Sequence, residues 1–168
     1  KPAFRKPIRS QRCLVIADAF YEGTTAEKLD KPYVVYLKNK QAPFAFAGIW
    51  DTWKDPETDE VVNSFAIVTT VANSLLQKIP HHRSPIILPR HREQAWLNST
   101  KPLTDITRML EPFPGELMNA YPVSPAMKNP RANDRSLLNP VGPALEPDEL
   151  LKEVVTLQLH GMGHYKSK

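Results

Sequence analysis

Proline is the residue that most limits how this chain folds. Seventeen prolines are spread along 168 residues, about twice the average share of a globular protein. Proline fixes φ and lacks a backbone N–H, so it interrupts both helices and the interior of sheets. The chain is therefore expected to form one domain of many short elements joined by irregular loops, long enough to bury about two-thirds of its unfolded surface.

Short apolar and β-branched runs predict most of the regular structure. Strands are expected at 13–16, 32–37, 44–50, 64–70 and 118–123. Short helices are expected at 72–79, 90–97 and 104–110, with Thr104 as the cap of the last, and a final helical turn or two at 147–151. The hydrophilic stretch 55–60 is typical of a hairpin loop, and 124–143 of an irregular loop. This pattern predicts an α+β fold with a largely antiparallel sheet.

Composition argues against several functional classes. No apolar run approaches the roughly 20 residues that a membrane helix needs, and the basic start of the chain lacks the features of a secretory signal. A single cysteine, Cys13, excludes an internal disulfide and fits a reducing, cytoplasmic setting. His160 and His164 are spaced four residues apart, but intervening glycines disfavour a helix there, so no metal is expected. No glycine-rich phosphate loop appears, so no nucleotide cofactor is expected either.

The net charge of +4 is unevenly distributed. Basic residues cluster in 1–12, which holds Arg5, Arg9 and Arg12, in 81–92, and in 128–135. Such clusters could together line one groove for a polyanion. The alternative is that each cluster is simply a solvated face of the protein.

The most informative segment runs from Ile79 to Pro89. His81 can exchange a proton near neutral pH, and Arg83 can hold a phosphate or carboxylate with its planar fork. Prolines on both sides of these two residues restrain the backbone. A catalytic loop has this composition, and so does an ordinary polar loop.

Glu22 is the second candidate, because it ends an apolar and aromatic stretch. A carboxylate in such surroundings tends to have a raised pKa, which suits a general acid or base. The alternative is an exposed glutamate at the end of a strand. Cys13 has apolar neighbours and is expected to be an inert, buried thiol. Thr69 and Thr70 could cap the following helix or face a ligand.

Five segments, taken in order, resemble one known family. Residues 12–22 (RCLVIADAFYE) are similar to the pattern Arg-Cys-Leu-x-Pro-Ala-Asp-Gly-Phe-Tyr-Glu-Trp, and 44–50 (FAFAGIW) to the strand that follows it. Residues 65–73 carry a Thr-Thr-x-Ala-Asn element, 81–88 resemble His-x-Arg-Met-Pro-x-x-Leu, and 121–124 with 133–134 complete the order. The resemblance, over about residues 1–142, is to the SOS response-associated peptidase (SRAP) family of abasic-site processing proteins.

The resemblance implies a barrel-like or bifurcated β core with surrounding short helices, and a specific chemistry. Members of the family bind single-stranded DNA at an abasic site and crosslink to it. An N-terminal cysteine attacks the sugar aldehyde and closes a thiazolidine ring. The family's catalytic glutamate and histidine correspond to Glu22 and His81. Arg83, Thr70 and the basic residues Arg5, Arg9 and Arg12 become the expected DNA contacts.

The sequence departs from the family pattern in ways that affect function. Residue 1 is lysine, and neither the N-terminal cysteine nor the family's Asn-Ala-Arg-x-Glu motif is present, so a chain starting there is expected to be inactive in crosslinking. Gly23 stands in place of Trp and Ser84 in place of Met, and residues 144–168 lie outside the resemblance. Two other functions stay open, a hydrolase whose peptidase activity is self-processing and a non-catalytic module for single-stranded DNA. The sequence does not indicate an oligomeric state.

Overall fold

The structure, a computed structural model, describes residues 4–38 and 42–146. Its strands are β1 (Arg12–Ala17), β2 (Ala19–Thr24), β3 (Lys28–Leu37), β4 (Phe44–Lys54), β5 (Val61–Ile67), β6 (Thr69–Val71), β7 (Arg83–Pro85), β8 (Ile87–Leu88) and β9 (Met118–Pro122). Its helices are α1 (Pro7–Ser10), α2 (Ser74–Lys78), α3 (Arg90–Leu97) and α4 (Leu103–Thr107), with single 3-10 turns η2 (Gly115–Leu117), η3 (Pro125–Lys128) and η4 (Arg135–Leu138).

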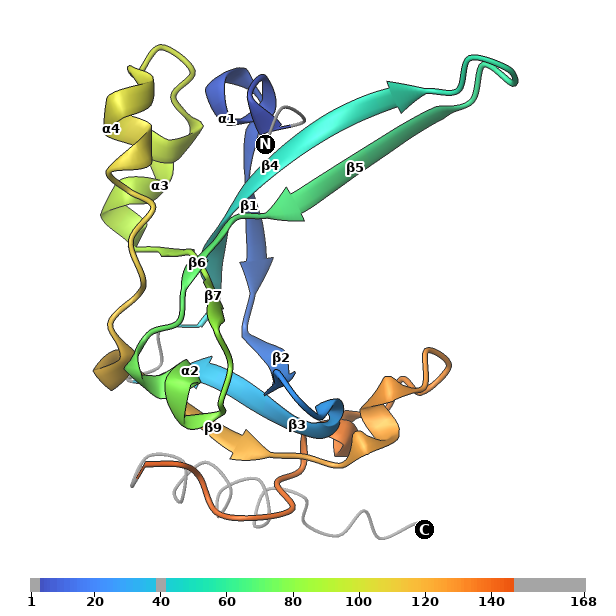
Figure 1. Cartoon of the computed structure of the whole chain (residues 1–168), viewed down its shortest axis with the longest axis vertical. Helices are drawn as coiled ribbons and strands as arrows, with labels where there is room; N and C mark the ends of the chain where they lie inside the picture. The colour runs from blue at the N-terminus through green and yellow to red at the C-terminus, as the bar shows by residue number, and fades with distance from the viewer. Residues whose placement is uncertain (1–3, 39–41, 147–168) are drawn as a thin grey trace, which may run out of the picture.

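The strands form three antiparallel sheets. The first has the order β1-β4-β5, with β8 also pairing with β4; the second is β2-β3-β9, and the third is the two-stranded ribbon β6-β7. Figure 1 shows the β4–β5 hairpin reaching away from the rest of the molecule as a long arm, with α3 and α4 on the opposite side. The α+β, largely antiparallel prediction is confirmed, although no closed barrel forms among the described residues.

Strand β4 begins with a continuous apolar run because both of its faces are covered there. Phe44 and Phe46 enter one core, where they meet β3, α2 and β9. Ala47 and Ile49 point to the other face and pack with Trp96 of α3 in a second core. Alternate side chains of a strand point to opposite faces, so a strand between two cores has no polar row.

The outer half of the arm is solvated. Every residue of β5 is exposed, and so are residues 50–54 of β4. Trp50 and Phe65 face each other across the pair, and their exposed fractions are 42% and 64%. The arm therefore carries an uncovered apolar strip beyond the two cores.

Most predicted elements are present, with shifted boundaries. The expected strand over 64–70 is broken at Val68, so that β5 and β6 belong to different sheets. Neither Thr69 nor Thr70 caps α2, because the side chain of Asn73 accepts from Leu76 N–H at 3.0 Å. Thr104 does not cap α4 either, since that helix begins one residue earlier.

The burial of Cys13 differs from the prediction, and two predicted features cannot be compared with the structure. Cys13 is only half-buried, not enclosed as expected, although burial does raise the pKa of its thiol. The predicted helical turn at 147–151 and the histidines at 160 and 164 lie outside the described residues. Within the described part, no helix is long and apolar enough to cross a membrane, and no three His, Cys, Asp or Glu side chains form a group that could hold a metal ion.

Arg12 joins β1 to α1 and α3. Its guanidinium donates to the carbonyls of Ile8 and Arg9 at 2.8 and 2.6 Å, and to those of Trp96 and Asn98 at 2.5 and 2.6 Å. The side chain is 7% exposed. This corrects the expectation that Arg12 contacts DNA, because its N–H groups are used to close helix ends inside the protein.

Replacing Arg12 with alanine is expected to lower the free energy of unfolding by about 2–3 kcal/mol, because buried carbonyls lose their donors. Urea unfolding followed by circular dichroism measures this. Arg9→Ala is the matched control at an exposed position of α1, with an expected change within about 0.5 kcal/mol. Equal losses in the two variants would contradict this role for Arg12.

Candidate functional site

Glu22 lies on the face of β2 that points toward the first core, near the end of the strand. Phe20 and Glu22 point to the same face of the strand, and Phe20 packs against the first core. Glu22 comes one step later along that row and is 20% exposed. The strand alternation thus places a carboxylate where the core meets solvent.

His81 meets this carboxylate from the chain segment after α2. Its Nε2 lies 3.5 Å from Oε1 of Glu22, and its side chain is also 20% exposed. Apolar residues of α2 and Ile79 hold the segment in the core. Glu22 and His81 are 59 residues apart in sequence, and the expectation that they lie within about 10 Å is confirmed by this distance.

The hydrogen bonds of His81 define its tautomer. Nδ1 lies 2.8 Å from the carbonyl oxygen of Arg83. A carbonyl only accepts, so we assign the proton to Nδ1 as donor. Nε2 then faces Glu22 and can accept or release a proton there, directly or through one water.

Opposing influences act on the Glu22 carboxyl. Burial raises the pKa of Glu22, while the N–H of Gly23, at 3.1 Å from Oε1, and the imidazoles of His81 and His82 lower it in part. The net direction is upward. A carboxyl whose pKa is moved toward neutrality, beside an imidazole, is the arrangement that general acid–base chemistry requires.

Arg83 lies next to the pair and is held by Thr69. Its Nε donates to Thr69 Oγ1 at 3.0 Å, and its Nη2 to the Thr69 carbonyl at 2.8 Å. The guanidinium stays exposed, so it can reach an anion in solution. Sequence reasoning selected Thr70 here, but Thr70 pairs with Ser84 and points to the opposite face of the ribbon from Arg83.

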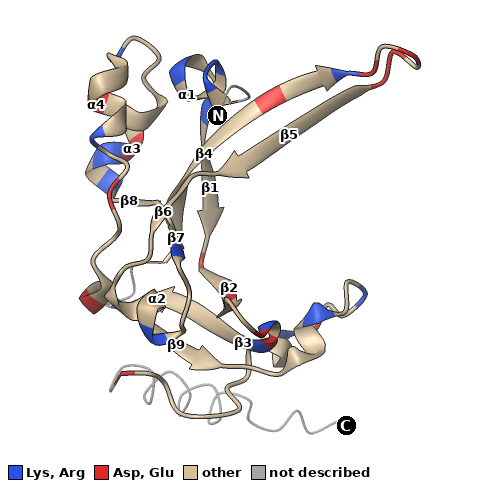
Figure 2. Cartoon of the chain, viewed as in Figure 1, with Lys and Arg blue, Asp and Glu red and all other residues tan. Residues whose placement is uncertain are grey.

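The other basic candidates lie elsewhere. Arg5 and Arg9 are exposed in and beside α1. Arg90 and Arg92 are on α3, where Arg90 donates to the Pro43 carbonyl and Arg92 pairs with Glu111. Figure 2 shows the basic residues of α1 and α3 at one end of the molecule, away from β7. The basic cluster 81–92 therefore does not form one surface.

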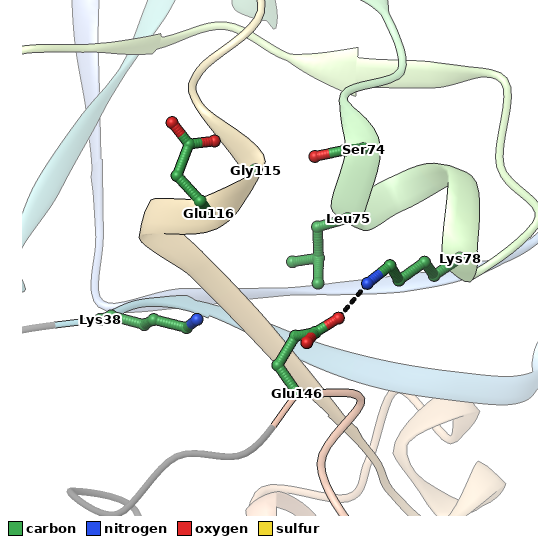
Figure 3. Close-up of a pocket in the computed structure, with 7 residues that line it drawn as sticks. All are labelled: Lys38, Ser74, Leu75, Lys78, Gly115, Glu116 and Glu146. Atoms are coloured by element: carbon green, nitrogen blue, oxygen red, sulfur yellow. Dashed lines mark hydrogen bonds and ion pairs between the residues drawn. The ribbon is translucent and has the colours of Figure 1, made fainter.

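A cavity of about 220 Å³ lies on another part of the protein, between α2 and η2 (Figure 3). Its walls carry both signs of charge, from Lys38, Lys78, Glu116 and Glu146, and Figure 3 shows Lys78 reaching toward Glu146 while the Glu116 carboxylate points away from both lysines. Lys78 and Glu146 form an ion pair within it. A second cavity, of about 330 Å³, lies beside Phe44. Neither of these two cavities is lined by Glu22 or His81.

Three residues of the site have little sequence signal. His82 stands out only as the second member of a His–His pair, and Thr69 only as a neighbour of Thr70. Thr25 has no signal in the sequence, yet its hydroxyl lies 3.1 Å from Nδ1 of His82.

The chain is similar to several known proteins. The family model described as SOS response associated peptidase (SRAP) matches residues 1–130. The abasic site processing protein YoqW of Bacillus subtilis (strain 168) is 37% identical over 140 residues, which cover 82% of this chain and 61% of that protein. The abasic site processing protein HMCES of Gallus gallus is 27% identical over 161 residues, covering 84% of this chain and 47% of that protein.

A solved structure also matches. A crystal structure of a protein from Bacteroides thetaiotaomicron has a TM-score of 0.76 and 36% identity, over 84% of this chain and 62% of that one. The chain thus spans about 60% of the length of YoqW and of this structure.

The raised pKa of Glu22 predicts a pH-dependent change in stability. A carboxyl with a higher pKa in the folded state stabilises the fold below its unfolded pKa, and this stabilisation is lost as the pH rises through the folded value. At pH 8 the buried charge opposes folding, so Glu22→Gln is expected to raise the free energy of unfolding by on the order of 0.5 kcal/mol. Near pH 3.5 the carboxyl is mostly protonated in both states, and the gain disappears.

Urea unfolding at the two pH values tests this expectation. Glu57→Gln, at the exposed tip of the arm, is the control and should change little at either pH. A Glu22→Gln variant that is less stable than the wild type at pH 8 would show that the carboxylate is stabilising, contrary to the predicted direction.

Proposed function

The chain belongs to the SOS response associated peptidase (SRAP) family, and on that premise we propose that it processes abasic sites in single-stranded DNA through Glu22 and His81. The observation that carries the proposal is the 3.5 Å approach of His81 Nε2 to the Glu22 carboxylate. Both side chains are 20% exposed, so the two proton-transferring groups remain accessible from solvent at one point.

The chemistry at an abasic site needs such a pair. Ring opening of the abasic sugar exposes an aldehyde. An amine adds to this carbon, and the adduct loses water to form an imine; a thiol then adds across the C=N bond and closes a thiazolidine ring. The first addition and the loss of water each require proton transfer. Glu22 and His81 would supply and remove those protons.

In this proposal the nucleophile is the N-terminal cysteine that the family resemblance implies, not Cys13. Cys13 has no free α-amine, so it cannot close a thiazolidine ring. Burial raises the pKa of its thiol, which lowers the fraction of reactive thiolate. The same acid–base pair could serve the self-processing peptidase reaction, because amide hydrolysis also needs a proton for the leaving amine.

Arg83 is the proposed contact to the DNA backbone beside the lesion. Thr69 orients its guanidinium, and the exposed fork matches a phosphate. Arg5 and Arg9 on and near α1 remain proposed secondary contacts. Thr70 is proposed only as a neighbour of the bound DNA, since it lies on the opposite face of the β6–β7 ribbon from Arg83.

Charge reversal at Arg83 tests the DNA contact. Arg83→Glu is expected to weaken binding of an abasic single strand roughly tenfold, and to reduce the slope of log K against log salt by about 1. Fluorescence anisotropy at several salt concentrations measures both quantities. Arg108→Glu, an exposed residue of a different surface, should leave the slope unchanged, and an equal loss there would mean that only net charge matters.

Substitutions at the pair test the chemistry. In the protein extended to the family's N-terminal cysteine, Glu22→Gln and His81→Ala are each expected to slow adduct formation about 100-fold, with binding retained. Cys13→Ser should react at the wild-type rate. Denaturing gels with an abasic oligonucleotide give the rates, and borohydride traps any imine. Binding without any adduct in the wild type would favour the non-catalytic module instead.

A further inference from the structure

A second imidazole lies beside the acid–base pair. The ring of His82 is 5.2 Å from that of His81, centroid to centroid, with a tilt of 40°. The His-x-Arg pattern that the chain shares with the family includes His81 and Arg83 but leaves the residue between them open. His82 is thus a feature of this chain that the proposed reaction has not used.

His82 is held in place by the turn that follows β2. Its Nδ1 lies 3.1 Å from the hydroxyl oxygen of Thr25. The backbone of Thr25 also contacts the segment that precedes His82, because the Thr25 N–H donates to the Pro80 carbonyl at 3.1 Å. The turn therefore contacts the histidine segment through both a side chain and the main chain.

The close turn depends on Gly23. A Cβ at position 23 would lie 2.0 Å from the carbonyl oxygen of Lys28, which no other residue could accommodate without a backbone shift. The register of the β2–β3 pair shifts between Gly23 and Thr24 at this point. Glycine, where the family pattern has tryptophan, thus lets the turn fold back so that Thr25 reaches His82.

The charged neighbours of the pair are few. Glu22 faces the imidazoles of His81 and His82. In the turn, Glu27 pairs with Lys31 at 2.5 Å, and Lys28 is exposed beside them. On β7, Arg83 is bonded to Thr69. Among these neighbours, His82 is the one that brings a second imidazole to the pair, and an imidazole can carry or lack a proton.

We propose that His82, held by Thr25, is a positioning residue that makes the Glu22–His81 pair respond to pH. When His82 carries a proton, its charge favours the ionised Glu22 and disfavours a second imidazolium at His81. When it is neutral, both effects vanish. The role of His82 in catalysis rests on the proposed function, but its electrostatic coupling to Glu22 and His81 does not.

The coupling is measured on the free protein by nuclear magnetic resonance. The Glu22 carboxyl carbon and the His81 ring signals are followed from pH 4 to 9 in wild type and in His82→Asn, which retains a hydrogen-bonding group near Thr25. Loss of the charge is expected to raise both titration midpoints, by about half a pH unit. His91→Asn on α3 removes an exposed imidazole from another surface and should move neither midpoint.

The direction of the shift separates electrostatic coupling from a merely structural role. If His82 only supported the fold of the site, its loss would admit water and lower the Glu22 midpoint toward that of a free carboxyl. Thr25→Val keeps the imidazole but removes its restraint, and a smaller upward shift is expected. A downward shift in either variant, or the same shift in His91→Asn, would overturn the proposal.

The activity experiment then tests the consequence separately. The pH profile of adduct formation should move with the Glu22 midpoint in His82→Asn, and its rate at pH 8 should match the wild type. A profile that stays fixed while the midpoints move would overturn the positioning role. These rates are measured in the protein extended to the family's N-terminal cysteine; if that protein with no other change forms no adduct, the result would instead count against the proposed function, while the titration result would still stand.

Discussion

The burial of β4 on both faces is the constraint on which the rest of the structure depends. Phe44 and Phe46 anchor the core that holds β3, α2 and β9, while Ala47 and Ile49 anchor the core under α3. Each core needs the strand, because a sheet face is stable only when something covers it. Arg12 reinforces the second core by closing the ends of α1 and α3 with its guanidinium.

The site is a consequence of the first core. Residues of α2 are buried against β3 and β9, and the segment after α2 is thereby carried to the edge of β2. Glu22 and His81 meet where that core ends and solvent begins. The proposed reaction would need such a half-buried position, because full burial would exclude a DNA strand and full exposure would leave the Glu22 pKa at its ordinary value.

Two departures from the family pattern have local explanations. Gly23 permits a close approach of the backbone at Lys28 that a tryptophan would prevent. Ser84, where the pattern has methionine, is 1% exposed, and its hydroxyl donates to the Pro85 carbonyl at 3.3 Å. Both substitutions are therefore compatible with an intact site. The uncovered strip at Trp50 and Phe65 has no such explanation within the described residues.

The sequence by itself indicated most of the helices and strands, the family, and the candidate residues Glu22, His81 and Arg83. Periodicity and local motifs depend only on residues that are close together in the chain. Tertiary structure decided which residues meet. Arg12 looked like a surface cation but caps helix ends 84 and 86 residues away, and Thr25 meets His82 across 57 residues. Such partners depend on how the sheets pack, and no local pattern contains that information.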